Sequence, residues 1–411
     1  MKLHEFIKEK LREVIKAYCV TGFAKSRKMP YSISEKGKFL GIGKKGLRLI
    51  YETVDEIMKR REAIKNNFSP EFIENKLINV VLLRYFHPST NLNNALIQDA
   101  RNLLSCLKKA EQEWVFFIPI TNLTIMLRRG FTLGKVRFYG MDKSTMEYLE
   151  SKYKMRFGFG NSLDDRYSKV MKEINTTTFS TVKISAGEII KAREMAFDKV
   201  DAALNILRLY DQTRRIGIYG EVFSPVRNIY HINLTTKTRG ESISRIDFSP
   251  PLIIDDSYLS YLWKEGYFNI FNKLLKNKTP TPLERKILTS IHWYGLGVKD
   301  RNKLDKLVKF TIALESILLK EREPKRYHLA ERVAFILGKD KYGKKWFHDR
   351  VYKLYGIRSE IVHEGRKEIK EEDVYDMHRI VESVLFFMIQ KLNKFTTLDH
   401  VIEWVNALKF S

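Results

Sequence analysis

The first hundred residues carry apolar side chains at the spacing of amphipathic helices. Over residues 3–15 and again over residues 47–58, apolar positions return every three or four residues, which is the period of one helical face. A third helix should begin at Pro70, because Ser69 before it is a good N-cap and proline is favoured at the first helical position. The pattern therefore predicts a helical N-terminal region over residues 1–109.

A different pattern begins near Trp114, where dense runs of β-branched and aromatic residues indicate strands. Strands are predicted over residues 114–125, 136–139 and 176–185, with further strand-like pieces between residues 220 and 249. We expect the first three to pair in one sheet, because their apolar side chains require burial. A strongly amphipathic stretch after residue 185 predicts one long helix. Residues 110–280 are thus predicted to form a mixed α/β region.

Helical periodicity returns after residue 259, and a polar stretch with two prolines at residues 277–284 marks a boundary. Helices are predicted over residues 304–320, 326–337, 344–363 and 371–392, with a further helix over residues 398–408. Gly338 and Gly365 should end the second and third of these helices. The predicted fold class is α+β and predominantly helical, in which the mixed central region precedes a C-terminal four-helix bundle at residues 281–411.

The charge of the chain narrows the class of partner. Its 411 residues include 74 Lys plus Arg and 49 Asp plus Glu, which gives a formal net charge of +25. Such an excess favours association with a polyanion such as nucleic acid. A solvated surface that is merely rich in lysine would have the same composition, so charge alone does not decide between these interpretations.

Residue types also exclude several classes of site. Cys19 and Cys106 can form neither a disulfide framework nor a four-thiolate zinc site, and so low a cysteine content fits a reducing compartment. The histidines show no metal-binding spacing, so we expect no metal and no other cofactor. No run approaches the roughly 18 apolar residues of a membrane span. We therefore expect a soluble, cytoplasmic protein that has no membrane partner.

A glycine-rich segment at Gly41–Gly46 has the formal spacing GxGxxG. A dinucleotide site needs this motif directly after a buried strand, and the preceding residues look too polar for one. The segment also locally resembles the hairpin of a helix-hairpin-helix DNA-binding module. In that module Lys44, Lys45 and Arg48 would be candidate phosphate or nucleic-acid contacts. An ordinary glycine-rich turn is the simpler alternative.

One motif carries reaction chemistry. Arg358 and His363 lie five residues apart in the third predicted helix of the bundle, within the sequence YGIRSEIVHEG. Histidine titrates near neutrality and can take the proton of a ribose 2′-hydroxyl. Arginine keeps its charge and forks onto phosphate oxygens, so it can stabilise a dianionic transition state at phosphorus. The two residues together supply what RNA cleavage without a metal requires.

This Arg-x4-His motif resembles the signature of HEPN-domain ribonucleases, and most closely that of the Apea-like subgroup, in which RSxIVHxG is typical. Accessory segments follow the order of that subgroup, and they are Trp293-Tyr294-Gly295, Ala313-Leu314-Glu315-Ser316 within Asp305 to Leu318, and Leu329-Ala330-Glu331-Arg332-Val333-Ala334. The resemblance covers about residues 285–392. It is more specific than the Arg-x4-His spacing alone, because the accessory segments are uncommon.

The resemblance implies a metal-independent endoribonuclease that leaves 2′,3′-cyclic phosphate and 5′-hydroxyl ends, as in effectors of prokaryotic abortive infection. It also implies an RNA substrate and a homodimer through the HEPN bundle, in which two Arg–His pairs form one composite cleft. Ser359, Glu360 and Tyr355 are candidates to support the site, and Glu331 and Arg332 are expected to hold the third helix through ion pairs. Residues 1–280 would sense a trigger, restrain the nuclease or select the RNA.

Helical geometry leaves two interpretations of the motif open. Five residues at 100° each place Arg358 and His363 about 140° apart around an α-helix. The pair can converge if the helix unwinds before Gly365, or it can act with the pair of a symmetry mate. The alternative is a buried Arg–His–Glu network that only stabilises the bundle. The chain would then be a non-catalytic nucleic-acid-binding or scaffold protein whose bundle mediates dimerisation.

Overall fold

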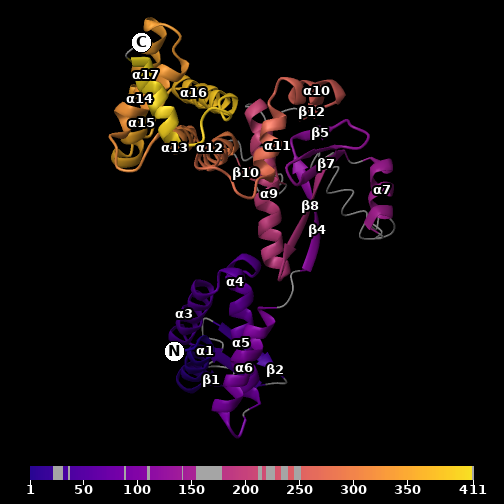
Figure 1. Cartoon of the computed structure of the whole chain (residues 1–411). Helices are drawn as coiled ribbons and strands as arrows, with labels where there is room; N and C mark the ends of the chain where they lie inside the picture. The colour runs from indigo at the N-terminus through magenta and orange to yellow at the C-terminus, as the bar shows by residue number, and fades with distance from the viewer. Residues whose placement is uncertain are drawn as a thin grey trace. The chain divides into compact units, whose positions relative to one another are not determined.

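The computed structural model describes residues 1–21, 31–35, 38–87, 89–108, 112–140, 142–153, 178–211, 215–218, 227–232, 239–244 and 251–409 (Figure 1). They form two compact units, one of residues 1–116 with 183–196 and the other of residues 117–182 with 197–411. The chain is predominantly helical with small sheets, as the sequence predicts. The finer division at residues 109 and 280 stays a prediction.

The first unit combines helices with a small antiparallel sheet. Its elements are α1 (Leu3–Glu13), a π-helical turn (Val14–Tyr18), β1 (Cys19–Thr21), β2 (Tyr31–Glu35), β3 (Lys38–Ile42), α3 (Lys44–Arg60), α4 (Glu62–Asn67), α5 (Pro70–Phe86) and α6 (Leu92–Cys106). The sheet order is β1-β3-β2. The helices bury one face each around a core that includes Ile7, Ile50 and Leu77. The Ser69 hydroxyl accepts a hydrogen bond from Phe72 N at 3.1 Å, which confirms the predicted N-cap of α5.

The larger sheet lies in the central part of the chain. Among the described residues it joins five strands in the order β6-β7-β8-β4-β9. These are β4 (Gln112–Thr121), β6 (Phe131–Leu133), β7 (Val136–Gly140), β8 (Thr178–Ala186) and β9 (Gly217–Ile218). The prediction that three central strands share one sheet is therefore confirmed, with β7 and β8 antiparallel and Val136 opposite Val182.

The predicted strand at residues 114–125 is divided in two. Asn122 has φ of 59°, a left-handed conformation that ends a strand, and asparagine tolerates it better than most residues. Beyond it, β5 (Leu123–Ile125) pairs in parallel with β12 (Leu252–Ile254) instead of continuing β4. The remaining elements of this part are α7 (Lys143–Tyr153), α9 (Ile189–Tyr210), the hairpin of β10 (Arg227–Ile232) and β11 (Arg239–Ser244), α10 (Asp256–Lys264) and α11 (Phe268–Lys276).

The C-terminal part is a helical bundle whose predicted helices are confirmed. They are α12 (Pro282–Lys299), α13 (Lys303–Leu318), α14 (Lys325–Leu337), α15 (Lys341–Ser359) with a π-helical turn η2 (Glu360–Glu364), α16 (Glu371–Gln390) and α17 (Leu398–Lys409). Helix α12 packs on α13, α14 on α15, and α16 on α13. No helix in the described part of the chain combines the length and apolar character that crossing a bilayer requires.

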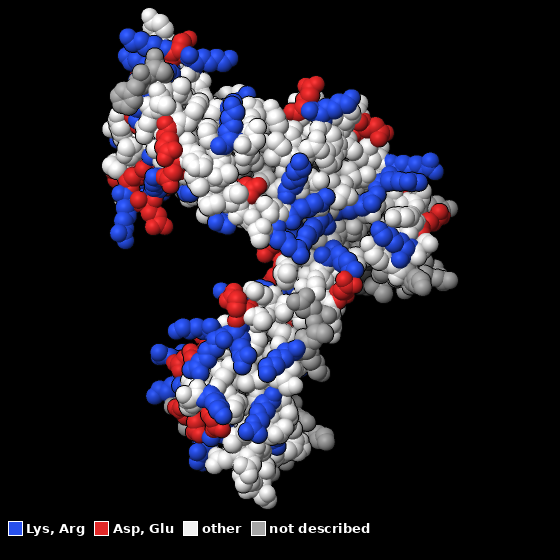
Figure 2. Space-filling view, viewed as in Figure 1, with Lys and Arg blue, Asp and Glu red and all other residues white. Residues whose placement is uncertain are grey.

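The excess positive charge is visible on the surface. In the view of Figure 2, Lys and Arg side chains gather over the region of α9 and α11. There Lys199 is half-buried, and burial together with the charge of Lys135 lowers its pKa. Basic surface of this kind raises the association rate with polyanions, and it does not by itself define a site.

A hydrogen bond between two buried rings joins α12 to α16. The Tyr294 hydroxyl lies 2.7 Å from His378 Nε2, and the two rings stack with centroids 5.2 Å apart. Burial, with smaller effects from the charges of Arg379 and Lys306, lowers the pKa of His378 to about 4. The imidazole is therefore neutral in the folded protein at pH 7.

This neutral imidazole makes bundle stability depend on pH. Because the pKa of His378 is lower in the folded than in the unfolded state, its contribution is complete above pH 6.5 and is lost as the pH falls towards 4. We expect the free energy of unfolding to decrease by roughly 3 kcal/mol from this group over that range. Urea unfolding of wild type and His378→Gln at both pH values tests this, since the variant should show a shallower decrease. An equal decrease in both proteins would contradict the assignment.

Candidate functional site

Helix α15 carries most of the candidate residues, and local sequence explains its start and orientation. The Asp340 carboxylate accepts a hydrogen bond from Gly343 N at 2.7 Å and caps the helix. Val351, Leu354 and Ile357 are buried, and they form the stripe that lies against the rest of the bundle. That stripe fixes the rotation of α15, and thereby determines which of its polar residues face solvent.

The end of α15 departs from regular α-helix within the motif. Residues Glu360–Glu364 form a π-helical turn, and Gly365 then ends it with φ of 71°. Glu360 O accepts backbone hydrogen bonds from both Gly365 N and Arg366 N. The expected unwinding before Gly365 thus takes the form of a widened turn. Since a π-helix turns by less than 100° per residue, the separation of Arg358 and His363 falls below about 140°.

His363 lies on the surface of this widened turn. Its side chain is exposed, and it forms no hydrogen bond or ion pair with any described residue. The neighbouring Val362 is 48% exposed. Both ring nitrogens of His363 are therefore available for proton transfer or for contact with another molecule.

Arg358 has a different environment, because its side chain is only 17% exposed. One terminal nitrogen, Nη2, lies 3.7 Å from Glu315 Oε1 on α13, and Nε is buried without a hydrogen-bond partner. The guanidinium carbon lies 5.7 Å from the ring centroid of Tyr355. Tyr355 is itself buried, and burial together with the neighbouring Glu315 raises its pKa. Arg358 is thus held between Glu315 and Tyr355, while its Nε–H group donates no hydrogen bond to a described residue.

Glu315 is the residue of this site that sequence reasoning did not single out. Its carboxylate lies 3.5 Å from Lys325 Nζ on α14 as well as near Arg358 on α15, so it faces cations from two helices. Its only signal in the sequence is its place in the Ala313–Ser316 segment of the family resemblance. Helical periodicity could not identify it, because its partners come from other helices.

Two other arginines of the bundle, Arg332 and Arg350, are committed to carboxylate partners. Arg332 forks onto the two oxygens of Glu323 and also donates to Leu318 O. Arg350 pairs with Asp373 and Asp376. Both arginines bind carboxylates within hydrogen-bonding distance, whereas Arg358 approaches its carboxylate only to 3.7 Å.

The expectation that Glu331 and Arg332 hold α15 is wrong. Arg332 binds the segment that precedes its own helix, through Glu323 and Leu318 O. Glu331 pairs with Lys409 on α17 and lies 3.8 Å from His328 on its own helix. Both side chains therefore stabilise other neighbours of α14.

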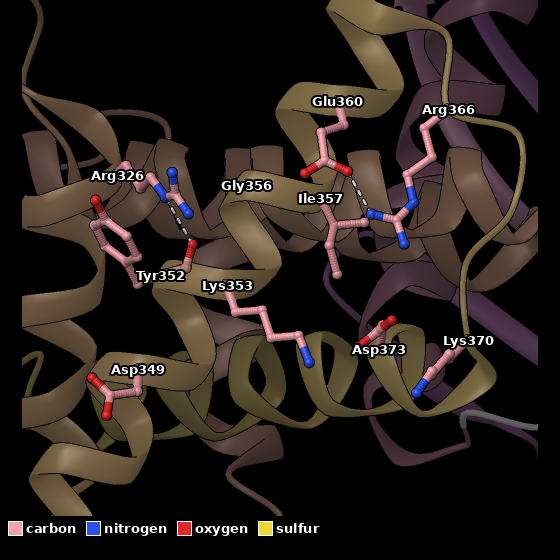
Figure 3. Close-up of a pocket in the computed structure, with 10 residues that line it drawn as sticks. All are labelled: Arg326, Asp349, Tyr352, Lys353, Gly356, Ile357, Glu360, Arg366, Lys370 and Asp373. Atoms are coloured by element: carbon pink, nitrogen blue, oxygen red, sulfur yellow. Dashed lines mark hydrogen bonds and ion pairs between the residues drawn. The ribbon is translucent and has the colours of Figure 1, made fainter.

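Glu360 lies at a cavity of about 520 Å³ rather than beside Arg358 (Figure 3). It forms an ion pair with Arg366, and Ser359 is half-buried. The cavity is lined by Arg326, Asp349, Tyr352, Lys353, Gly356, Ile357, Glu360, Arg366, Lys370 and Asp373. The structure therefore groups Tyr355 with Arg358, and it places Glu360 in a separate hollow lined by residues of both charges.

The glycine-rich segment of the first unit forms neither of the two modules considered for it. Residues Lys38–Ile42 are a strand after all, although their polar neighbours suggested otherwise, because pairing with β1 and β2 on both sides satisfies the backbone. These antiparallel partners exclude a parallel βαβ dinucleotide site, and strands stand where a helix-hairpin-helix needs its first helix. Gly43 is the N-cap of α3.

The three basic residues of that segment lie at the start of α3, and their role as phosphate contacts stays a prediction. Lys44 and Lys45 are exposed in the first turn of α3. Arg48 forms an ion pair with Glu52, with Nε and Oε1 3.3 Å apart. They belong to the first compact unit, whereas Arg358 and His363 belong to the second.

Within the described ranges, no three His, Cys, Asp or Glu side chains come together in a way that could hold a metal ion. Comparison of the chain with protein-family models, curated proteins and solved structures finds no match.

The contrast between Arg332 and Arg358 gives a stability prediction. Arg332→Met should lower the free energy of unfolding by about 3–5 kcal/mol, because it removes a buried guanidinium that binds both Glu323 and Leu318 O. Arg358→Met should lower it by about 1 kcal/mol or less, because Glu315 keeps Lys325 as a partner. Urea unfolding followed by circular dichroism measures both. Equal losses would identify Arg358 as a structural residue.

Proposed function

We propose that this protein is a metal-independent endoribonuclease of the HEPN type, in which Arg358 and His363 act on the RNA backbone. The observation that carries the proposal is that both side chains keep hydrogen-bonding capacity that no described residue uses. His363 has no partner among the described residues, and Arg358 Nε has no hydrogen bond. This disfavours the alternative of a buried Arg–His–Glu network, because His363 is exposed and takes no part in one.

The proposed reaction uses the chemistry of each group. His363 accepts the proton of a 2′-hydroxyl while that oxygen attacks the adjacent phosphorus. Arg358 donates hydrogen bonds to the phosphate oxygens as negative charge accumulates. The bond from phosphorus to the 5′-oxygen breaks, and that oxygen takes a proton from the imidazolium or from water. The products are a 2′,3′-cyclic phosphate and a 5′-hydroxyl.

A homodimer would complete the site. The exposed Val362 and His363 at the end of α15 can meet the same surface of a second copy, as a two-fold axis requires. An Arg358 from one protomer could then face a His363 of its partner. We propose this composite arrangement, with residues 1–280 as the region that senses a trigger or selects RNA in a cytoplasmic defence effector.

The cleavage reaction gives the first test. Purified protein should cut unpaired RNA in the presence of EDTA, because the proposed step draws on no metal. His363→Ala should reduce the rate by roughly 10²–10⁴-fold with the fold intact. Arg358→Lys should restore little activity, because an ammonium cannot fork onto two oxygens. End analysis of the fragments on a denaturing gel measures both rate and product chemistry.

Another exposed histidine of the bundle, His400, provides a matched control. His400→Ala should cleave at the wild-type rate, since this side chain lies on α17 outside the motif. Loss of cleavage in EDTA, or wild-type activity in the Arg358→Ala, His363→Ala double variant, would exclude the mechanism. RNA binding without cleavage by the wild type would favour the alternative of a non-catalytic nucleic-acid-binding protein.

Subunit mixing tests the composite site. Arg358→Ala and His363→Ala proteins, each inactive alone, should regain about one quarter of wild-type activity after they are unfolded and refolded together. Half of the dimers are then mixed, and each mixed dimer holds one intact site of two. No recovery in dimers shown to be mixed by differential tagging would mean that both residues act within one chain.

A further inference from the structure

A ladder of rings lies on the surface formed by α14 and α15. Tyr327 and His348 are in edge contact with centroids 6.1 Å apart, and His348 stacks on Tyr352 at 6.0 Å with an interplanar angle of 16°. Tyr327 is 52% exposed and Tyr352 is 40% exposed. Both tyrosines therefore expose a large part of their side chains to solvent.

Arg326 extends this ladder with a planar cation. Its guanidinium carbon lies 3.8 Å from the ring centroid of Tyr352, and its Nε donates to Tyr352 O at 2.9 Å. Gly356 leaves the space for it, since a Cβ there would come within 2.7 Å of Arg326 Nη2. The guanidinium is therefore held flat on the ring. Together, Tyr327, His348, Tyr352 and Arg326 form what we call the stacking ladder.

The cavity beside the ladder has unbalanced positive charge (Figure 3). Two of its carboxylates are neutralised, because Glu360 pairs with Arg366 and Asp373 pairs with Arg350. Its third carboxylate, Asp349, is hydrogen-bonded to His348.

Lys353 and Lys370 line the same cavity, and no described carboxylate forms an ion pair with them. Arg326 likewise has only the Tyr352 carbonyl as a hydrogen-bond partner. A ring surface thus adjoins a hollow with three cations that have no ion-pair partner.

We propose that the stacking ladder and this cavity bind unpaired nucleotides of RNA, with bases on the ladder and phosphates at Lys353 and Lys370. The inference rests on the proposed function and specifies how its substrate is held. Aromatic rings and arginine planes are the surfaces on which proteins stack splayed bases, and lysines neutralise the backbone between them. A base pair inside a duplex offers no free face, so unpaired RNA is selected.

A second copy of the chain suits this surface poorly. Across a two-fold axis it would place Arg326, Lys353 and Lys370 close to the same three cations of the other protomer, and like charges in such proximity are destabilising. RNA, by contrast, has negatively charged phosphates for the three cations and planar bases for the rings, so it matches both features of this surface.

Binding of uncleavable RNA tests the inference separately from catalysis. A fluorescent 2′-O-methyl oligoadenylate lacks the attacking hydroxyl, and the same oligonucleotide with abasic sites lacks the rings. Wild type should bind the first more tightly than the second. Tyr327→Leu and Tyr352→Leu should each lose roughly 5- to 100-fold in affinity for the base-bearing strand and little for the abasic one, as stacking requires.

The control for the ring variants is Tyr342→Leu, which removes an 86% exposed tyrosine elsewhere on α15 and should bind as wild type does. Gly356→Ala favours the helix but displaces Arg326, so it should weaken binding without loss of thermal stability. Lys353→Gln with Lys370→Gln should lower the slope of affinity against salt by about 0.7 for each lost contact, whereas Lys345→Gln should not.

Three results would overturn the inference. They are unchanged affinity in both folded tyrosine variants, preference for a duplex of equal length, and loss of self-association in those variants without loss of RNA binding, which would identify a copy interface. Absence of cleavage by a protein that still binds through the ladder would instead count only against the proposed nuclease activity.

Discussion

The widened turn at the end of α15 is the constraint on which the candidate site depends. Gly365 adopts a left-handed conformation that residues with a Cβ rarely take, so the helix has to end there. The turn before it spans more residues than an α-helical turn, and its backbone is closed by two hydrogen bonds to Glu360 O. His363 is thereby kept at the surface while Arg358, one turn earlier, stays against the bundle. Local backbone geometry thus exposes His363 while it keeps Arg358 anchored against the bundle.

The bundle contains two kinds of arginine, and their difference has an energetic meaning. Arg332 and Arg350 satisfy their guanidinium groups with carboxylates, as a stable interior requires. Arg358 leaves Nε buried and without a partner, a state that costs roughly 1–3 kcal/mol. Unsatisfied buried groups are few in native proteins, and use by a ligand or a reaction is one reason to retain them. Glu315 Oε1, beside Arg358, is also buried without a hydrogen-bond partner among the described residues, so the two atoms mark one polar spot between α13 and α15.

Sequence reasoning succeeded where structure is determined locally. The helices follow from apolar periodicity, and Ser69, Pro70 and Gly365 mark their ends by capping chemistry that acts over a few residues. It failed where distant segments decide the outcome. The strand at Lys38–Ile42 exists because two other strands pair with it, and Glu315 gains its role from cations on α14 and α15. The stacking ladder was invisible for the same reason, since Tyr327 and Tyr352 come from different helices.

The ladder and the Arg358–His363 pair occupy different sides of α15, and this limits how one RNA strand could use both in the proposed reaction. Gly356, on the cavity side, and Arg358 are about 160° apart around the helix, so a strand cannot reach both along one face. The RNA strand can cross at the end of the helix, where Val362 and His363 are exposed. There the polypeptide continues through Arg366 and Lys370, which line the cavity. In the described bundle, the end of α15 is thus where His363, the proposed general base, is followed within a few residues by Arg366 and Lys370 of the cavity. A strand held on the ladder and passed over that end would arrive at His363 with its backbone unstacked, which in-line attack by a 2′-hydroxyl requires.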